Sequence, residues 1–259
     1  MPKLGRRSEK TLLQHHRVLK LALKTAVKWR LVVRNSADAV ETPRPEHREM
    51  RAIDERETGI LLDLARGTRL YVPLLVAVTT GLRRGELLAV RWQDVDLVRA
   101  MLTVRQTVEQ TRGCIQFKKP KTKKSQRTIA LLTMTMDALR VHDIEQKKAR
   151  LMIGPAYKDQ GLVFAREDGS VWPPNALTMA YRKLVRKAGL QTLRLHDLRH
   201  SHATQLLRQG VHPKVVSERL GHSTIAITLD TYSHVLPGIQ EEAASKLNAA
   251  LHAAFYLKP

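Results

Sequence analysis

The stretch from Leu193 to Val235 constrains the fold most, because it predicts three short helices separated by two breaks. Gly210 and the His-Pro pair that follows it end the first helix and begin the second. The segment Leu220–Ser223 forms the next break, before a third helix that has Tyr232 near its end. A chain with this pattern folds its C-terminal part as a compact group of helices.

Four polar side chains of this stretch are candidates for one site. They are His196, Arg199, His222 and Tyr232. His196 and Arg199 are three residues apart, so one turn of a helix places them on the same side. Two imidazoles, a guanidinium and a phenol suit the attack of a tyrosine oxygen on a phosphodiester. The guanidinium would hold anionic oxygens, the imidazoles would manage protons, and the phenol would be the nucleophile.

The charge of the chain indicates a polyanionic partner. Lys and Arg number 45 against 24 acidic residues, which gives a net charge of +21. A basic protein kept soluble by its charge is one alternative, and an acidic membrane surface is another, although no amphipathic anchor or lipidation motif is evident. The longest apolar runs fall short of the ~18 residues of a membrane span. The single cysteine, Cys114, excludes an intrachain disulfide and is consistent with a reducing cytoplasm.

Several motifs resemble those of the tyrosine recombinase, or phage integrase, family. They are the H-x-x-R pair, the triplet Leu-Gly-His that ends at His222, and the tyrosine ten residues after that histidine. The segment TTGLRRGELLAVRWQDVDL resembles the first arginine box of the family, which implies that Arg83 is a catalytic arginine. Glu86, three residues further on, is expected to hold Arg83 through a salt bridge. Apolar runs on both sides predict that Arg83 is buried.

A second basic segment adds a candidate lysine. Alternating patterns around residues 101–105, 115–117 and 128–131 predict a three-stranded antiparallel sheet. The lysine-rich run 118–125 lies between the last two strands, and most of its lysines are typical of a solvated hairpin tip. The family has a catalytic lysine in this hairpin. Lys121 matches that position best, and Lys123 is the alternative.

The predicted fold class is α+β, mainly α. Ser8 is expected to cap a helix that runs to about Trp29. Further helices are expected at 54–67, 70–80, 134–152, 174–188 and 239–255. The resemblance implies an integrase-type catalytic domain over residues 46–259. It also implies that residues 1–45 are a linker and a partial, N-terminally shortened helical core-binding (SAM-like) DNA-binding segment.

The resemblance implies a bacterial or phage site-specific DNA recombinase or integrase that works without metal, cofactor or ATP. Its six implied catalytic residues are Arg83, Lys121, His196, Arg199, His222 and Tyr232. The two arginines and His222 would bind the non-bridging oxygens, while His196 accepts the tyrosine proton or assists its removal. Lys121 would protonate the leaving 5′-oxygen, and Tyr232 would become joined to a 3′-phosphate.

The family's oligomers imply that the last helix docks onto a neighbouring protomer, as part of a homo-oligomer, expected to be a tetramer, on DNA. Two other functions stay open. A type IB topoisomerase-like enzyme would nick and reseal DNA alone, although a lysine is expected there in place of His196. An inactive, truncated DNA-binding integrase remnant would form no covalent adduct with DNA.

Overall fold

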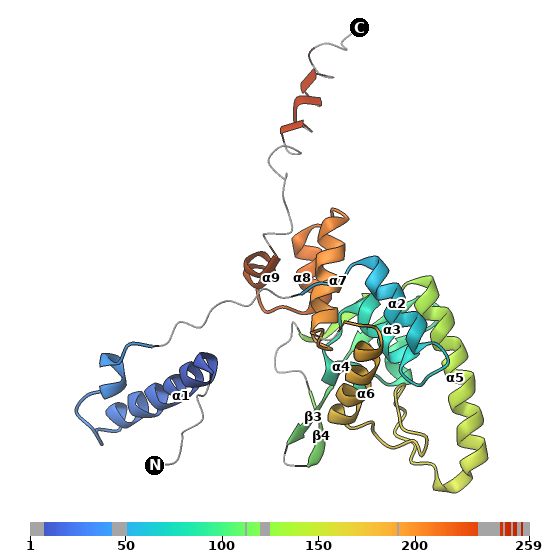
Figure 1. Ribbon diagram of the computed structural model, residues 1–259, viewed down its shortest axis with the longest axis horizontal. Helices are drawn as coiled ribbons and strands as arrows, with labels where there is room; N and C mark the ends of the chain where they lie inside the picture. The colour runs from blue at the N-terminus through green and yellow to red at the C-terminus, as the bar shows by residue number, and fades with distance from the viewer. Residues whose placement is uncertain are drawn as a thin grey trace. The chain divides into compact units, whose positions relative to one another are not determined.

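The computed structural model describes most of the chain. The described residues are 8–42, 51–111, 113–119, 125–190 and 192–232, with 244, 245, 247–249, 251, 252 and 255 nearer the C-terminus. The chain divides into two compact units, Met1–Glu49 and Met50–Pro259. Figure 1 shows the helices and strands of both units.

The first unit consists of α1 (Glu9–Lys28) and the 3-10 helix η1 (Ser36–Ala39). The Ser8 hydroxyl accepts a hydrogen bond from the Thr11 backbone N–H, which confirms the predicted cap. The Asn35 side-chain amide, just before η1, donates to the Lys20 carbonyl at 3.1 Å and holds η1 against α1. Most of the predicted linker lies outside the described residues.

The second unit is built around α3 (Tyr71–Thr80), which is apolar on every side and buried from its third residue onward. It packs against α2 (Glu55–Ala65), α5 (Thr133–Ile153) and α7 (Asp197–Arg208) (Figure 1). The Asp54 carboxylate caps α2 by accepting a hydrogen bond from the Glu57 N–H at 2.7 Å. A helix with no polar face is stable only inside such a helical layer.

The remaining helices surround this centre. They are α4 (Arg84–Leu88), η2 (Trp92–Asp94), η4 (Gly154–Ala156), α6 (Pro174–Lys187), α8 (Pro213–Leu220) and α9 (Ile225–Tyr232). The predicted helices over residues 54–188 are thereby confirmed, as are the three helices of the 193–235 stretch. Of the predicted last helix at 239–255, only part belongs to the described residues.

The three-stranded antiparallel sheet is also confirmed, but its membership differs from the prediction. It has the order β1 (Val95–Asp96), β2 (Met101–Val104), β5 (Arg127–Ala130). The predicted strand at 115–117 belongs instead to β4 (Cys114–Lys118), which pairs with β3 (Thr107–Thr111) in a separate hairpin. The reason is burial: β2 and β5 each bury alternate side chains, whereas β4 has no buried residue.

This pairing changes the setting of the basic run 118–125. The sequence predicts that this run is the tip of a hairpin. That prediction is wrong, because β4 and β5 do not pair with each other and the run instead connects two sheets. Lys121 and Lys123 lie in its central part, which is outside the described residues.

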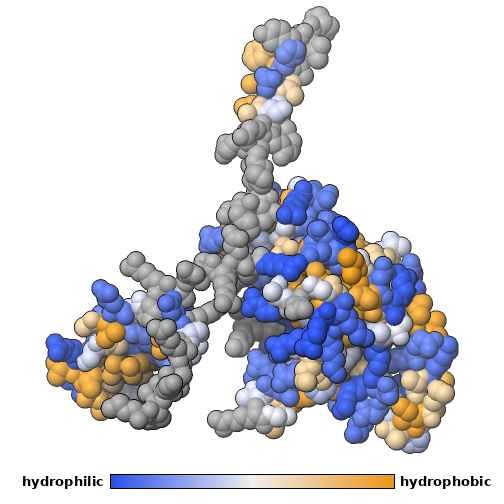
Figure 2. Space-filling view, viewed as in Figure 1, coloured by the Kyte–Doolittle hydropathy of each residue, from blue (hydrophilic) through white to orange (hydrophobic). Residues whose placement is uncertain are grey.

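The second unit is thus mainly helical with a small antiparallel sheet, as predicted. Hydrophilic residues cover much of its visible face (Figure 2), and apolar side chains such as Leu151 and Met152 are exposed at the C-terminal end of α5. None of the described helices has the length and apolar character needed to cross a membrane.

Candidate active site

Arg83 enters the site from a tight turn between α3 and α4. Gly81, at the end of α3, has a φ of +66°, and a Cβ there would lie 2.7 Å from a Leu220 methyl carbon and 2.8 Å from the His202 ring. Only glycine fits both constraints. The turn therefore brings the next residues of the chain, including Arg83, directly beside the end of α8.

Glu86 holds Arg83 in two ways. The Arg83 Nη1 donates to Glu86 Oε1 at 2.8 Å, and the Arg83 backbone N–H donates to Oε2 at 3.0 Å. The predicted salt bridge is confirmed. The expected burial of Arg83 is wrong, because its side chain is 41% exposed while that of Glu86 is 6% exposed. The buried carboxylate fixes the guanidinium on one side, and the exposed side of Arg83 stays open to a ligand.

Arg199 is the most enclosed cation of the site, at 3% exposure. Its Nη1 donates to the Gly81 carbonyl at 2.8 Å and its Nη2 to the Leu220 carbonyl at 2.7 Å. A guanidinium has five N–H donors, so further donors remain for an anion. Burial and the nearby Arg83 lower the pKa of Arg199 to about 9, and the group remains charged at neutral pH.

His222 follows directly on the end of α8. Gly221 has a φ of +69° and turns the chain there. The His222 Nδ1 lies 2.8 Å from the Thr228 hydroxyl of α9, which orients the ring and leaves Nε2 for a ligand. Burial, followed by the charge of Arg199, lowers the pKa of His222 to about 4. The imidazole is therefore neutral at neutral pH and can donate one hydrogen bond from Nε2 when Nδ1 accepts from Thr228.

Arg127 is a structural member of the site that the sequence reasoning missed. It lies at the start of β5, its side chain is 6% exposed, and its Nη2 donates to Glu86 Oε2 at 2.8 Å. Its Nε donates to the Arg219 carbonyl at 2.7 Å, near the end of α8. The strand alternation was a usable signal, since it puts Arg127 on the same face as Ile129, which is buried.

Arg127 thereby connects the sheet to α4 through Glu86 and to α8 through the Arg219 carbonyl. A Cβ on Gly221 would lie 2.8 Å from Arg127 Nη1, so the glycine allows the end of α8 and the start of β5 to approach closely. Burial opposes ionisation of Glu86, but the hydrogen bonds and charge of Arg127, helped by Arg83, lower its pKa to about 2. The carboxylate is fully charged at neutral pH.

Tyr232 lies at the end of α9 and is 3% exposed. Its ring packs against an apolar cluster that consists of Ala203, Leu207, Val216 and Leu220. Its hydroxyl oxygen lies 2.6 Å from Nδ1 of His200, a residue of α7. Burial, opposed by the charge of Arg199, raises the pKa of Tyr232 to about 12, so the phenol is protonated at neutral pH.

His196 occupies a different place from the one expected for the partner of Tyr232. It precedes α7, is exposed, and makes no hydrogen bond to Tyr232 within the described part of the chain. Its ring lies edge-on to that of His200, with centroids 4.9 Å apart. His200 was missed as well, although its spacing of four residues from His196 places it on the same side of α7.

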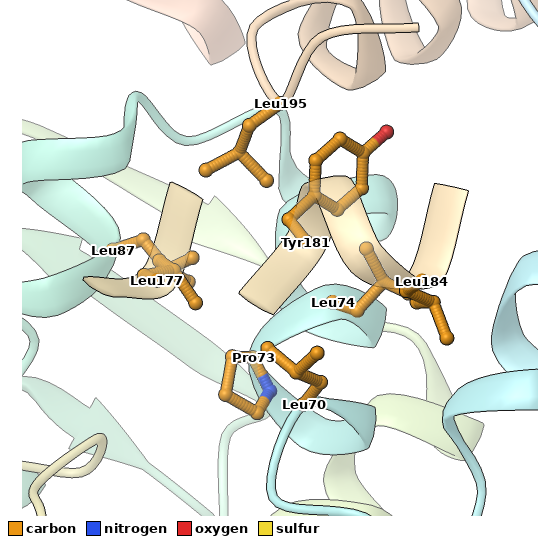
Figure 3. A pocket seen from close by; sticks show the side chains of 8 residues that line it. All are labelled: Leu70, Pro73, Leu74, Leu87, Leu177, Tyr181, Leu184 and Leu195. Atoms are coloured by element: carbon orange, nitrogen blue, oxygen red, sulfur yellow. The ribbon is translucent and has the colours of Figure 1, made fainter. Parts of the chain in front are cut away.

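A small apolar cavity lies behind this site. Figure 3 shows its lining, which consists of Leu70, Pro73, Leu74, Leu87, Leu177, Tyr181, Leu184 and Leu195. Leu195 directly precedes His196, so this apolar wall fixes the turn that leads into α7. In the figure the Tyr181 hydroxyl points away from the apolar lining, and the cavity offers no polar group to a ligand.

The structure thus gathers five of the six predicted residues around the ends of α3, α8 and α9 and the start of α7. They are Arg83, His196, Arg199, His222 and Tyr232. Lys121 lies outside the described residues. Among the described residues, no group of His, Cys, Asp or Glu side chains could hold a metal ion.

The fold is that of an integrase catalytic domain, and residues 51–238 match the model of the phage integrase family. The chain belongs to this family of tyrosine recombinases.

Two curated relatives support the assignment. A tyrosine recombinase XerC-like protein of Caldanaerobacter subterraneus subsp. tengcongensis is 34% identical over 212 residues, which are 77% of this chain and 54% of that protein. The ICEBs1 integrase of Bacillus subtilis is 29% identical over 232 residues, 88% of this chain and 62% of that protein. The chain thus spans between half and two thirds of the length of these relatives.

Solved structures show the same fold. The Tn1549 transposon integrase in complex with a circular intermediate DNA has a TM-score of 0.79 at 21% identity, and the match covers 95% of this chain and 81% of that chain. The XerA recombinase has a TM-score of 0.60 at 22% identity, with coverage of 94% and 85%.

Proposed function

We propose that this protein is a site-specific DNA recombinase that cleaves and rejoins DNA through a covalent 3′-phosphotyrosyl intermediate. The observation that carries the proposal is the placement of a buried tyrosine hydroxyl beside a histidine, in the charge field of Arg199. A phenol in an apolar cluster needs no such neighbours for packing alone. Next to cations that can hold a phosphate, it has the surroundings of a nucleophile.

Arg83, Arg199 and His222 are proposed to bind the non-bridging oxygens of the scissile phosphate. The two guanidiniums are anchored by carbonyl and carboxylate acceptors and retain free N–H donors. His222 adds a donor at Nε2. Donors that are fixed before the reaction stabilise the pentacoordinate transition state without reorganising, and each is worth roughly two to three orders of magnitude in rate.

Proton transfers complete the proposed reaction. As Tyr232 attacks phosphorus, its proton passes to an imidazole, for which the sequence resemblance implies His196. Lys121 is proposed to protonate the departing 5′-oxygen. The covalent bond stores the phosphodiester energy, so rejoining by the reverse reaction needs no nucleotide.

Double-stranded DNA is the proposed partner, and α6 offers a surface for its backbone. Four basic side chains of α6 are exposed on the face opposite its buried apolar stripe: Arg182, Lys183, Arg186 and Lys187. In the described part of the chain none of them forms a salt bridge, so all are available to phosphates. The Tn1549 relative was solved with DNA bound, which supports the same class of partner here.

Assembly into a tetramer through the C-terminal helix also remains a proposal, because most of that segment is outside the described residues. The same holds for the assignment of residues 1–45 as a partial core-binding segment. The boundary between the compact units after Glu49 supports this division.

Covalent trapping tests the proposed function. Nicked suicide duplexes that tile the DNA flanking the gene are incubated with the protein, and the adduct is separated on a denaturing gel. We expect a band of protein joined to one duplex, which is lost in Tyr232→Phe although the variant still binds that duplex. Tyr157→Phe is the control and keeps the adduct. No adduct with any duplex, or an undiminished adduct in Tyr232→Phe, would refute the proposal.

A further inference from the structure

The hydroxyl of the proposed nucleophile is hydrogen-bonded to a histidine that is not among the six residues implied by the resemblance. His200 Nδ1 lies 2.6 Å from Tyr232 Oη. The two rings, from α7 and α9, have centroids 5.9 Å apart and are tilted by 50°. Both side chains belong to helices that pack on α8, so the contact is set by the helical framework.

The protonation states give this hydrogen bond a direction. Burial, followed by the charge of the neighbouring His196, lowers the pKa of His200 to about 4. Burial also raises the pKa of Tyr232 to about 12. At neutral pH both groups are therefore uncharged, and when the proton of the neutral imidazole is on Nε2, the phenol donates and Nδ1 accepts. The charged groups that act on His200 are Asp197, which favours the imidazolium, and Arg199 and Arg194, which oppose it.

We propose that His200 is the group that accepts the proton of Tyr232 when the tyrosine attacks the phosphodiester; this rests on the proposed function. The Tyr232 Oη–P bond forms while the Oη–H bond breaks, and the proton moves to His200 Nδ1. The P–O5′ bond breaks in the same displacement, and its oxygen takes a proton from a separate acid. On rejoining, His200 returns the proton to Tyr232.

The energetics fit a transfer that occurs only during the attack. A free phenol holds its proton too firmly for a weakly basic imidazole. As the new O–P bond forms, the phenol oxygen loses electron density and its acidity rises. The negative phosphate that enters the site also favours the imidazolium. Burial thus keeps the nucleophile protonated until a phosphate arrives, with His200 already in position to take the proton.

His196 has a different position in this scheme. Its ring is exposed and lies edge-on against His200 at 4.9 Å between centroids. It therefore contacts His200 on one side and solvent on the other. From there it orients the His200 ring, or contacts the phosphate or leaving group, without touching Tyr232 itself.

Substitutions at position 200 separate proton transfer from positioning. The Oδ1 atom of His200→Asn takes the place of Nδ1 as a hydrogen-bond acceptor but cannot take a proton at neutral pH. His200→Ala removes the acceptor and leaves space for a small base. His212→Ala removes an exposed imidazole from the N-terminus of α8, outside the Tyr232 contact, and is the matched control. Thermal unfolding and DNA binding of each variant are measured alongside.

Single-turnover adduct formation on the suicide duplex gives the result. We expect both His200 variants to be slower by about 10²- to 10⁴-fold, with His212→Ala near the wild type. Added imidazole should accelerate His200→Ala in proportion to its neutral form and leave His200→Asn unchanged. The inference is overturned if His200→Asn reacts within threefold of the wild type, or if imidazole leaves His200→Ala unchanged. If the wild type itself forms no adduct, the proposed function fails instead.

Discussion

Breaking the buried ion pair between Glu86 and Arg127 tests how the site is held together. Both side chains are 6% exposed and their nearest atoms are 2.8 Å apart. Charge centres about 4 Å apart at an effective dielectric constant of 20 attract each other by about 4 kcal/mol. The pKa of Glu86, lowered from 4.5 to about 2, gives a similar figure of about 3 kcal/mol at 1.36 kcal/mol per unit.

The sign of this contribution follows from the direction of the shift. The folded-state pKa of Glu86 lies below its unfolded value, so the stabilisation is complete above pH 4.5 and is lost as the pH falls toward 2. Measurements at pH 7.5 therefore detect all of it.

A double-mutant cycle isolates the pair. Glu86→Gln, Arg127→Met and the double variant are unfolded in urea at pH 7.5, and the free energies of unfolding are compared. We expect a coupling energy of about 3 kcal/mol, because each single variant leaves a buried charge without its main partner. The control cycle uses Glu145→Gln and Lys148→Met, an exposed pair with an expected coupling below about 0.5 kcal/mol. A coupling for Glu86 and Arg127 as small as that of the exposed pair would refute the reasoning.

Three further predictions follow from charge and protonation. The affinity for DNA should fall steeply as the salt concentration is raised, because the basic side chains of a protein with a net charge of +21 displace counterions from the DNA on binding. A nearly flat plot of log K against log salt concentration would contradict this. Stability should fall by up to about 3 kcal/mol as the pH is lowered from 6 to 5, since burial lowers the pKa of His200 and His222 to about 4 and of His202 to about 3, while solvent screening reduces the share of the half-buried His200 and His222. Only the unfolded chain binds those three protons, and urea titrations at pH 7, 6 and 5 measure the slope. Lys121→Ala should slow cleavage of a normal 5′-oxygen and spare a substrate with sulfur at that position, whereas rescue of Lys123→Ala alone would assign the acid to Lys123.

The helices were predictable because their signals are local. Ser8 and Asp54 accept hydrogen bonds from backbone N–H groups within three residues, and Gly189 follows α6 with a positive φ. Each feature acts over one helical turn, so it can be read from neighbouring residues. The same is true of the salt bridge between Arg83 and Glu86, which are one turn apart.

The sheet could not be assigned in the same way, because strand pairing depends on distant residues. The short strand Val95–Asp96 has too few residues to show any alternation, yet it pairs with β2. The 115–117 strand has alternation without burial, and it joins β3 instead. The contact between Arg127 and Glu86 joins residues 41 positions apart, so no spacing rule predicts it.

The way the arginines are held explains why the site remains strongly positive. Arg199 is anchored by two backbone carbonyls, which fix its position without neutralising its charge. Glu86 is shared between Arg83 and Arg127, so a single carboxylate serves two guanidiniums. The nearby imidazoles are neutral at neutral pH. About two positive charges are thus left uncompensated where a phosphodiester would bind, which suits a pentacoordinate transition state more negative than its ground state. A carboxylate in place of the carbonyls would hold Arg199 as firmly but remove half of that charge.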